Sequence, residues 1–315
     1  MIKKILYTSA FALLLSNPTS VFAETLNKED ALKRALQSNP SYMAVLANID
    51  AAAGTRLQAS LPPNPDAVLE VENFAGDNQR EGFDEAEITL GLAQKIELGG
   101  KRRSRTEVAD FGHKIAQEEA LTQALKLLSE TEYAFIRMAV AQERVDLSEK
   151  RLELADQTHE IVKKRIGAAK SAEIQHTKAD IEKASAEVEK RNAEKDYRAA
   201  RNDLARLLGL DNGDNLVIEA DLSVLPELVD RQALINALSE TPQARMQEFA
   251  KMQAQSSLDL AKASGVPDPT FGVGVRRFND NDDTALVASL SFPLPVFNRN
   301  QGGIQTARAN VVQAE

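Results

Sequence analysis

The stretch RMAVAQERVDLSEKRLELADQTHEIVKKRIGAAKSAEIQHTKADIEKASAEV, residues 137–188, decides the fold of this chain. It contains no proline and one glycine, Gly167, and is rich in Ala, Glu, Lys, Arg and Leu, which favour helices. Outward from it, the sequence from Ser104 to Gly209 also contains no proline. We therefore predict a hairpin of two long helices over 104–209, joined near Gly167.

Each predicted helix carries two apolar stripes rather than one. Within a stripe the residues recur every seven positions, and the two stripes are offset by two positions. Positions two apart lie about 200° apart around a helix, so the stripes lie on nearly opposite sides. The stripes are Met138, Val145, Leu152, His159 and Ile166; Val140, Leu147, Leu154 and Ile161; Ala172, Ala179, Ala186, Ala193, Ala200 and Leu207; and Ile174, Ile181 and Val188.

Two opposed stripes indicate that each helix has a neighbour on either side. A two-stranded coiled coil needs one apolar seam, whereas every helix in a closed ring contacts two others. The pattern favours a ring of helices, an α-barrel. The alternative is an overlong dimeric coiled coil whose second stripe has no partner.

The N-terminus has the pattern of a secretory signal peptide over residues 1–23. Lys3 and Lys4 precede an apolar run, and Val21-Phe22-Ala23 places small residues at the expected cleavage positions. A retained membrane anchor is the alternative, although the apolar run is short for a membrane span. Loss of two lysines with the leader shifts the net charge from −9 by two units, to −11.

Charge and cysteine usage exclude several classes of protein. A strongly acidic chain argues against nucleic acid as a partner. The absence of cysteine excludes disulfides, thiolate metal sites and a lipid-modified N-terminal cysteine. An exported chain of this kind is expected in the periplasm or the outer membrane.

The sequence predicts an internal duplication, with a first repeat over 24–226 and a second over 227–315. Chance alignment of segments with similar composition is the alternative. Corresponding positions occur in the same order in both repeats. The matches are Ala31-Leu32, Ala35-Leu36 and Asn39-Pro40 with Ala233-Leu234, Ala237-Leu238 and Thr241-Pro242; Pro63 and Pro65 with Pro267 and Pro269; and Leu92, Ile96, Leu98 and Lys101 with Leu290, Leu294, Val296 and Arg299.

In each repeat, a short helix broken at Pro40 or Pro242 and a second helix precede two predicted strands. Apolar residues then alternate with polar or small ones, which predicts strands at about 66–75 and 86–98 in the first repeat and 269–278 and 284–296 in the second. One alternative is a small soluble sheet. Strands of this length also suit a membrane barrel, and four strands cannot close one, so the barrel requires oligomerisation. The residues expected to face lipid are Ile88, Leu90, Leu92, Phe271, Val273 and Val275.

Several features of the sequence together resemble those of a known protein family. The duplicated strand pairs between long helices, the run Glu97-Leu98-Gly99-Gly100-Lys101-Arg102 and the helix end Leu204-Ala205-Arg206-Leu207-Leu208-Gly209 resemble the TolC-type outer-membrane efflux proteins. Within them, the first run looks most like the CzcC branch, which exports heavy-metal cations. The resemblance covers essentially the whole mature chain.

The resemblance implies an α+β, mainly α fold in which long antiparallel helical hairpins form an α-barrel. Each protomer of a homotrimer would give four strands to a twelve-stranded transmembrane barrel. It further implies an outer-membrane location and a tripartite system with a periplasmic adaptor and an inner-membrane pump of the resistance-nodulation-division type. The channel would be a passive conduit, and its cargo stays open among metals and organic compounds.

No catalytic, cofactor or metal site is predicted. His113, His159 and His176 are scattered in the sequence, and His159 falls on an apolar stripe, where an interface role is favoured over a metal ligand. An exported enzyme and a periplasmic coiled-coil adaptor are the alternative functions. Adaptors lack the duplicated strand pairs.

The turn of the hairpin is predicted to contact the adaptor through Arg165, Ile166, Gly167 and Ser171. Gly167 is expected to take a left-handed conformation that ends one helix, and Ser171 to cap the next. Simple chain reversal is the alternative role.

The second repeat stops at Glu315, soon after Gly302-Gly303 opens what should be a second long helix. We therefore expect the 315 residues to be a fragment or truncated product that lacks a matching hairpin.

Overall fold

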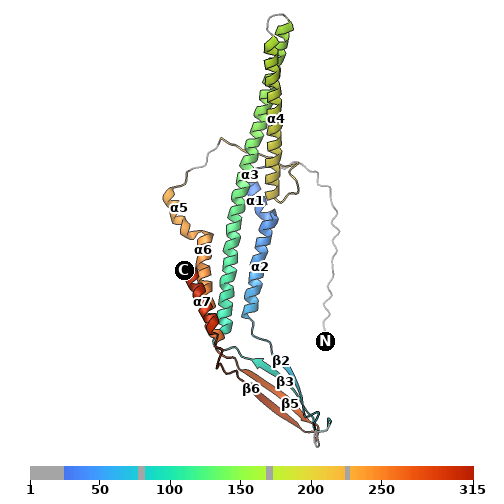
Figure 1. Ribbon diagram of the computed structural model, residues 1–315, viewed down its shortest axis with the longest axis vertical. Helices are drawn as coiled ribbons and strands as arrows, with labels where there is room; N and C mark the ends of the chain where they lie inside the picture. Colours follow the sequence, from blue (N-terminus) through green and yellow to red (C-terminus); the bar gives the residue numbers. More distant parts are fainter. Residues whose placement is uncertain (1–24, 77–81, 168–172, 224–227) are drawn as a thin grey trace, which may run out of the picture. The chain divides into compact units, whose positions relative to one another are not determined.

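The structure is a computed structural model, and it describes residues 25–76, 82–167, 173–223 and 228–315. The predicted signal peptide lies outside the described residues. The elements, labelled as in Figure 1, are β1 Thr25–Leu26, α1 Lys28–Ser38, α2 Pro40–Ser60, β2 Asp66–Glu72, β3 Glu87–Lys95, α3 Lys101–Gly167, α4 Glu173–Leu207, β4 Val217–Ile218, α5 Arg231–Ala237, η2 Leu238–Glu240, α6 Pro242–Ser264, β5 Thr270–Phe278, β6 Thr284–Ser291 and α7 Gln301–Ala314.

The chain divides into two compact units. One unit combines the chain up to Asn39 with Leu127–Leu225, and the other combines Pro40–Lys126 with Pro226–Glu315. The second unit draws on both sequence repeats. The repeats are therefore not separate compact bodies, because strands of one repeat pair with strands of the other.

In the first unit, α4 packs antiparallel against the later part of α3 (Figure 1). The side of α4 that faces α3 is lined with alanine, and Ala179, Ala186 and Ala200 are buried. Small side chains allow the two helices to approach closely, and the large Met138 of α3 is fully buried. The stripe headed by Met138 and the alanine stripe thus form the seam inside the hairpin.

The second stripe of each helix is exposed. Leu147 and Leu154 on α3 are 67% and 63% exposed, and Ile174 and Ile181 on α4 are 63% and 61% exposed. The prediction of two stripes on different sides is confirmed. Within the described chain one stripe of each helix is buried or half-buried and the other is exposed, and Ala172 lies outside the described residues.

The C-terminal end of α4 is closed by a left-handed glycine. Gly209 has φ +68°, and the Leu210 N–H donates to the Ala205 carbonyl at 2.9 Å while the Gly209 N–H donates to Arg206 at 3.2 Å. This is the Schellman arrangement, which satisfies carbonyls at a helix end. A β-carbon on Gly209 would overlap the carbonyl group of Ser38 at the end of α1.

The ends of α1 and α4 are held together by further backbone contacts. The Asn39 side-chain amide donates to the Leu207 carbonyl at 3.0 Å. β1 and β4 pair in parallel, with Thr25 opposite Val217. The N-terminal residues of the described chain are thereby fixed beside the segment that follows α4.

The second unit contains a four-stranded antiparallel sheet in the order β2-β3-β5-β6. Its central pair joins β3 of the first repeat to β5 of the second, with Gly91 opposite Gly274. A β-carbon on Gly91 would lie 2.7 Å from the Val273 carbonyl oxygen, so glycine lets these two strands approach.

The first part of α3 lies between α2 and α6. Arg56 of α2 forms an ion pair with Asp110 of α3. From the other repeat, Gln253 of α6 donates to the Val108 carbonyl of α3 at 3.2 Å, and Arg245 lies 3.4 Å from Glu118. α6 also packs against α7.

Several boundaries differ from those expected from the sequence. α3 begins at Lys101 rather than Ser104, because Gly99 and Gly100 both have positive φ and the helix starts directly after them. β2 ends at Glu72, since Asn73 turns the chain with φ 54°. β3 ends at Lys95 and β6 at Ser291, and prolines follow β6.

α3 has 67 residues and is therefore about 100 Å long. Within the described residues, none of the helices combines the length and the apolar character required of a membrane-crossing helix.

Gly209→Ala should destabilise the first unit. Alanine would have to adopt the left-handed conformation and would overlap Ser38, so we expect a loss of about 1 to 3 kcal/mol in the free energy of unfolding. Thermal denaturation followed by circular dichroism measures this loss. The matched control is Gly54→Ala in α2, where a β-carbon meets no atom within 4 Å and a slight stabilisation is expected. Equal effects of the two substitutions would contradict the role assigned to Gly209.

Candidate functional site

The sheet has one apolar face. Residues directly opposite each other in antiparallel strands share a face, and Leu90 lies opposite Val275 while Leu92 lies opposite Val273. On the flanking strands, Leu69 and Leu286 extend the same face. All six residues expected to face lipid lie on it: Leu90, Leu92, Phe271, Val273 and Val275 are exposed, and Ile88, opposite Arg277, is half-buried.

The other face is small and polar. Arg276 projects from it and lies 2.7 Å from Glu72 and 2.6 Å from Glu87, and its Nε donates to the Thr89 hydroxyl at 2.8 Å. One guanidinium thus joins strands β2, β3 and β5. The sheet therefore separates an apolar surface from a polar one, as a membrane strand with a water-filled lumen does.

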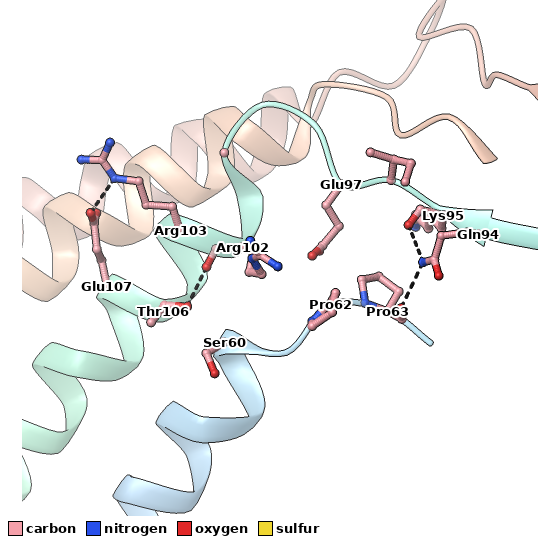
Figure 2. Close-up of a pocket in the computed structure, with 12 residues that line it drawn as sticks. Ser60, Pro62, Pro63, Gln94, Lys95, Glu97, Arg102, Arg103, Thr106 and Glu107 are labelled. Atoms are coloured by element: carbon pink, nitrogen blue, oxygen red, sulfur yellow. Dashed lines mark hydrogen bonds and ion pairs between the residues drawn. The ribbon is translucent and has the colours of Figure 1, made fainter. Parts of the chain in front are cut away.

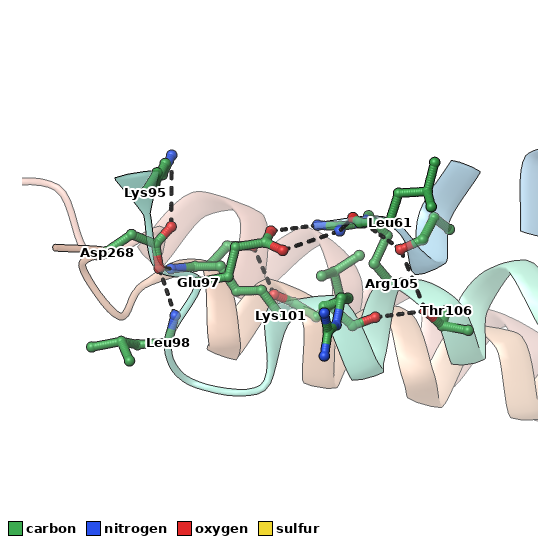
Figure 3. Close-up of polar contacts among 12 residues, drawn as sticks. Leu61, Lys95, Glu97, Leu98, Lys101, Arg105, Thr106 and Asp268 are labelled. Atoms are coloured by element: carbon green, nitrogen blue, oxygen red, sulfur yellow. Dashed lines mark hydrogen bonds and ion pairs between the residues drawn. The ribbon is translucent and has the colours of Figure 1, made fainter. Parts of the chain in front are cut away.

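Between the sheet and the helices, a buried carboxylate holds the connection together. Asp268, in the loop before β5, forms an ion pair with Lys101 at the start of α3, and it accepts the Leu98 backbone N–H at 2.8 Å (Figure 3). Lys95 at the end of β3 lies 3.7 Å away. Burial raises the pKa of Asp268, but the hydrogen bonds from Lys101 and Leu98 outweigh burial, so the pKa lies below its usual value.

A second ion pair joins the same turn to α2. Arg105 binds both oxygens of Glu97, at 2.6 and 3.2 Å, and donates to the Ala59 and Leu61 carbonyls at 2.9 and 3.1 Å (Figure 3). These carbonyls lie at the C-terminal end of α2. The hydrogen bond from Arg105 lowers the pKa of Glu97, against the effect of burial.

The polar contacts line a hollow between the end of α2 and the start of α3. Figure 2 shows Pro62, Glu97 and Thr106 around it. Gln94 donates across it to the Pro63 carbonyl at 3.1 Å. The hollow belongs to the same sheet–helix joint, which we define as Glu97, Lys101, Arg105 and Asp268.

The turn between β3 and α3 needs a glycine at position 99 for steric reasons. Gly99 has φ +69°, and a β-carbon there would press on Val266 and on the Ala263 carbonyl. The run from Glu97 to Arg102 thus reverses the chain between β3 and α3 and supplies the two charged side chains that hold the turn. In this structure the run connects the strand to the helix and holds that connection in place.

The predicted adaptor contact lies at the end of α3. Arg165 and Gly167 are exposed and Ile166 is half-buried, whereas Ser171 lies outside the described residues. The left-handed conformation expected for Gly167 is wrong. Gly167 is the last residue of α3 and does not have a positive φ, because the helix continues through it.

Two of the histidines, although far apart in the sequence, lie close together in the structure. His159 on α3 and His176 on α4 lie with ring centroids 5.2 Å apart. The two helices run antiparallel, so residues near the end of α3 lie beside residues near the start of α4. His113 lies far along α3, in the other compact unit.

Sequence reasoning missed Asp268 and Arg105. Asp268 stands between Pro267 and Pro269, and an acidic residue inside a proline pair before a strand was the available signal. Arg105 follows the recognised run by three residues and looks like an ordinary charged helix residue. Its partners come from a different helix, which periodicity does not indicate.

A two-faced sheet joined to a helix about 100 Å long defines a class of membrane channel proteins that combine strands with long helices. A model of the family described as outer membrane efflux protein matches residues 31–210. The chain belongs to the outer membrane efflux protein family, and it is accordingly an outer-membrane protein with periplasmic helices. The predicted resemblance to this family is confirmed, and the mainly helical fold with four paired strands agrees with it.

Curated relatives come from the heavy-metal branch. The chain is 27% identical over 285 residues to the cobalt-zinc-cadmium resistance protein CzcC of Cupriavidus metallidurans, covering 90% of this chain and 66% of the relative. It is 29% identical over 306 residues to the nickel and cobalt resistance protein CnrC of the same organism, covering 96% of this chain and 71% of that one. The expected similarity to the CzcC branch is thus confirmed. The chain spans about two thirds of the length of these relatives.

Solved structures show the same fold. The Campylobacter jejuni CmeC outer membrane channel superposes with a TM-score of 0.73 at 16% identity, over 100% of this chain and 74% of that chain. A membrane protein from Pseudomonas aeruginosa gives a TM-score of 0.73 at 18% identity, over 91% of this chain and 71% of that one. These structures show the fold of the chain, and its family is that of the outer membrane efflux proteins.

The sheet–helix joint should weaken in acid. Asp268 and Glu97 have pKa values lowered from the ordinary 3.8 and 4.5, so their ionised forms stabilise the fold above these values and the stability is lost as the pH falls through the lowered ones. We expect a constant melting temperature from pH 7 to about 5 and a decline below about 4.

The double variant Glu97→Gln, Asp268→Asn should melt lower at pH 7 and show a smaller decline in acid. Glu107→Gln is the control, because the Arg103–Glu107 pair is exposed and should contribute little. An unchanged acid decline in the double variant would assign the effect to other carboxylates.

Proposed function

We propose that this chain is the outer-membrane channel subunit of a tripartite efflux system that exports heavy-metal cations. The observation that carries the proposal is that the chain leaves two apolar surfaces exposed, one on the sheet and one along the hairpin. A homotrimer in a membrane would cover both, with lipid against the first and neighbouring protomers against the second.

The sheet supports assembly from several copies. β2 and β6 are its outer strands, so each has one strand partner within the described chain. Backbone groups at an open edge cannot remain unpaired in lipid, and closure with strands of other copies satisfies them. Three copies would contribute twelve strands, with the face that carries Arg276 toward the lumen.

The hairpin supports the same assembly. Exposed leucines such as Leu147 and Leu154 occupy one line along α3, and Ile174 and Ile181 occupy one line along α4. Burying a leucine stabilises a contact by about 1.5 to 3 kcal/mol. Packing of these lines between protomers would close a helical tunnel across the periplasm.

The cargo and the partners are inferred from relatives. The printed names of the curated relatives concern resistance to cobalt, zinc, cadmium and nickel. In the proposed system an inner-membrane pump of the resistance-nodulation-division type supplies the energy, and a periplasmic adaptor contacts Arg165, Ile166, Gly167 and Ser171 at the hairpin turn. The channel itself is a passive conduit without catalysis and needs no cofactor.

The apolar face of the sheet should tolerate charge poorly. Leu90→Arg should destabilise the protein in lipid bilayers by about 2 to 4 kcal/mol if residue 90 lies near the bilayer midplane. Urea unfolding in bilayers measures the change. The control is Ser289→Arg on the other face, opposite Gly272, where the arginine would point into the lumen and little change is expected. Recovery of the wild-type protein from periplasmic extract without detergent would overturn the membrane assignment.

Export should depend on the exposed stripe of α3. In a strain that lacks the gene, wild-type protein should restore growth in cobalt, zinc or cadmium but not in a panel of organic drugs. The variant Leu147→Glu, Leu154→Glu should lose this activity and sediment as a smaller oligomer in detergent, because charge replaces apolar contact between protomers. Glu153→Lys, exposed on another side of α3, is the control. Full activity of a monomeric variant would contradict the proposed assembly.

A further inference from the structure

His159, His176 and Asp180 form a compact group of metal-ligating side chains near the end of the hairpin. His159 Nε2 lies 2.8 Å from Asp180 Oδ1, and His176 Nδ1 lies 2.8 Å from Asp180 Oδ2. The three ligand atoms all lie within 4.8 Å of one another. Two imidazoles therefore converge on one carboxylate.

The group interrupts a regular pattern of ion pairs between α3 and α4. Farther from the turn, each pair joins a Lys or Arg to a carboxylate across the two helices. They are Arg137–Asp203 at 3.5 Å, Lys190–Glu149 at 3.0 Å, Arg151–Glu189 at 2.7 Å and Lys183–Asp156 at 2.7 Å. At Asp180, two histidines replace the permanent cation. A full positive charge at this position is then available only from a proton or from a bound cation.

The geometry points to a divalent transition-metal site, and we propose that His159 Nε2, His176 Nδ1 and the Asp180 carboxylate bind one ion of the zinc or cobalt type. Neutral imidazole and carboxylate are ligands that such ions prefer, and three protein ligands leave positions for water. Metal–nitrogen and metal–oxygen distances of about 2.0 to 2.2 Å require only small side-chain rotations from the present separations.

Two neighbouring charged residues bear on the site. Lys183, less than one turn after Asp180 on α4, pairs with Asp156 at 2.7 Å. Glu160 lies 3.9 Å from His159 Nδ1, on the opposite side of the ring from the ligand nitrogen. When a metal replaces the proton on Nε2, the ring proton lies on Nδ1, and the Glu160 carboxylate stabilises it electrostatically without a direct hydrogen bond, so Glu160 is a positioning residue.

The ion would join the two helices close to the place where the chain reverses. His159 lies on α3 shortly before its end at Gly167, and His176 and Asp180 lie in the first two turns of α4. His176 and Asp180 have side chains 37% and 50% exposed, so an ion can reach the site from solvent. The site stands on the hairpin geometry alone and does not depend on the proposed export function.

Cobalt binding tests the proposal. The full chain, purified in detergent without a polyhistidine tag, is titrated with Co²⁺ while visible absorption is recorded, and Zn²⁺ is then added as competitor. We expect one Co²⁺ per protomer, with ligand-field bands that Zn²⁺ abolishes. His176→Gln and Asp180→Asn should each weaken binding at least about tenfold, and Glu160→Gln should weaken it about tenfold while retaining the bands.

His113→Gln is the matched control, because His113 is the third of the three histidines and lies elsewhere on α3, and it should bind as the wild type does. Circular dichroism establishes that each variant keeps its helices, and the two ligand variants on α4 provide independent tests. Absence of saturable Co²⁺ binding by the wild-type chain would overturn the proposal. So would undiminished binding by both His176→Gln and Asp180→Asn. If the chain binds Co²⁺ but does not restore export, the proposed channel function fails and the metal site stands. If it restores export but does not bind Co²⁺, the metal site fails and the channel function stands.

Discussion

A helix with two opposed apolar stripes needs two neighbours, and the rest of this structure depends on that constraint. Inside the chain, one stripe of α3 is buried or half-buried beside the alanines of α4, and the other is exposed. A single hairpin cannot cover both sides of both helices. The uncovered stripes, together with the outer strands of the sheet, direct the chain toward assembly rather than toward a closed globular core.

The sheet–helix joint solves a second physical problem, the passage from strands to helices without unpaired polar groups. Asp268 accepts from Lys101 and from the Leu98 backbone, while Arg105 satisfies the last carbonyls of α2 and the Glu97 carboxylate. Groups from both sequence repeats meet here. The buried charges are therefore paired, which is the condition under which burial is tolerated.

The hairpin combines structural and chemical roles along one pair of helices. Most of its length carries ion pairs between permanent charges, which fix the register of α3 against α4. Near the reversal these give way to His159, His176 and Asp180, whose charge depends on what they bind. In this relative of metal-resistance proteins, the proposed metal site thus lies at the end of the hairpin that is next to the turn.

The sequence by itself determined the periodic features: two stripes on each long helix, four alternating strands and the family motifs. Periodicity reports the side of an element on which a residue lies, so the apolar face of the sheet that carries Leu90 and Val273 could be read from it. It does not report which distant residues meet. Only the tertiary structure decided that Asp268 meets Lys101, because this contact joins two repeats, and that His159 meets His176, because it requires the antiparallel register of two helices. It also decided the conformation of Gly167, since a glycine permits a left-handed turn but does not impose one.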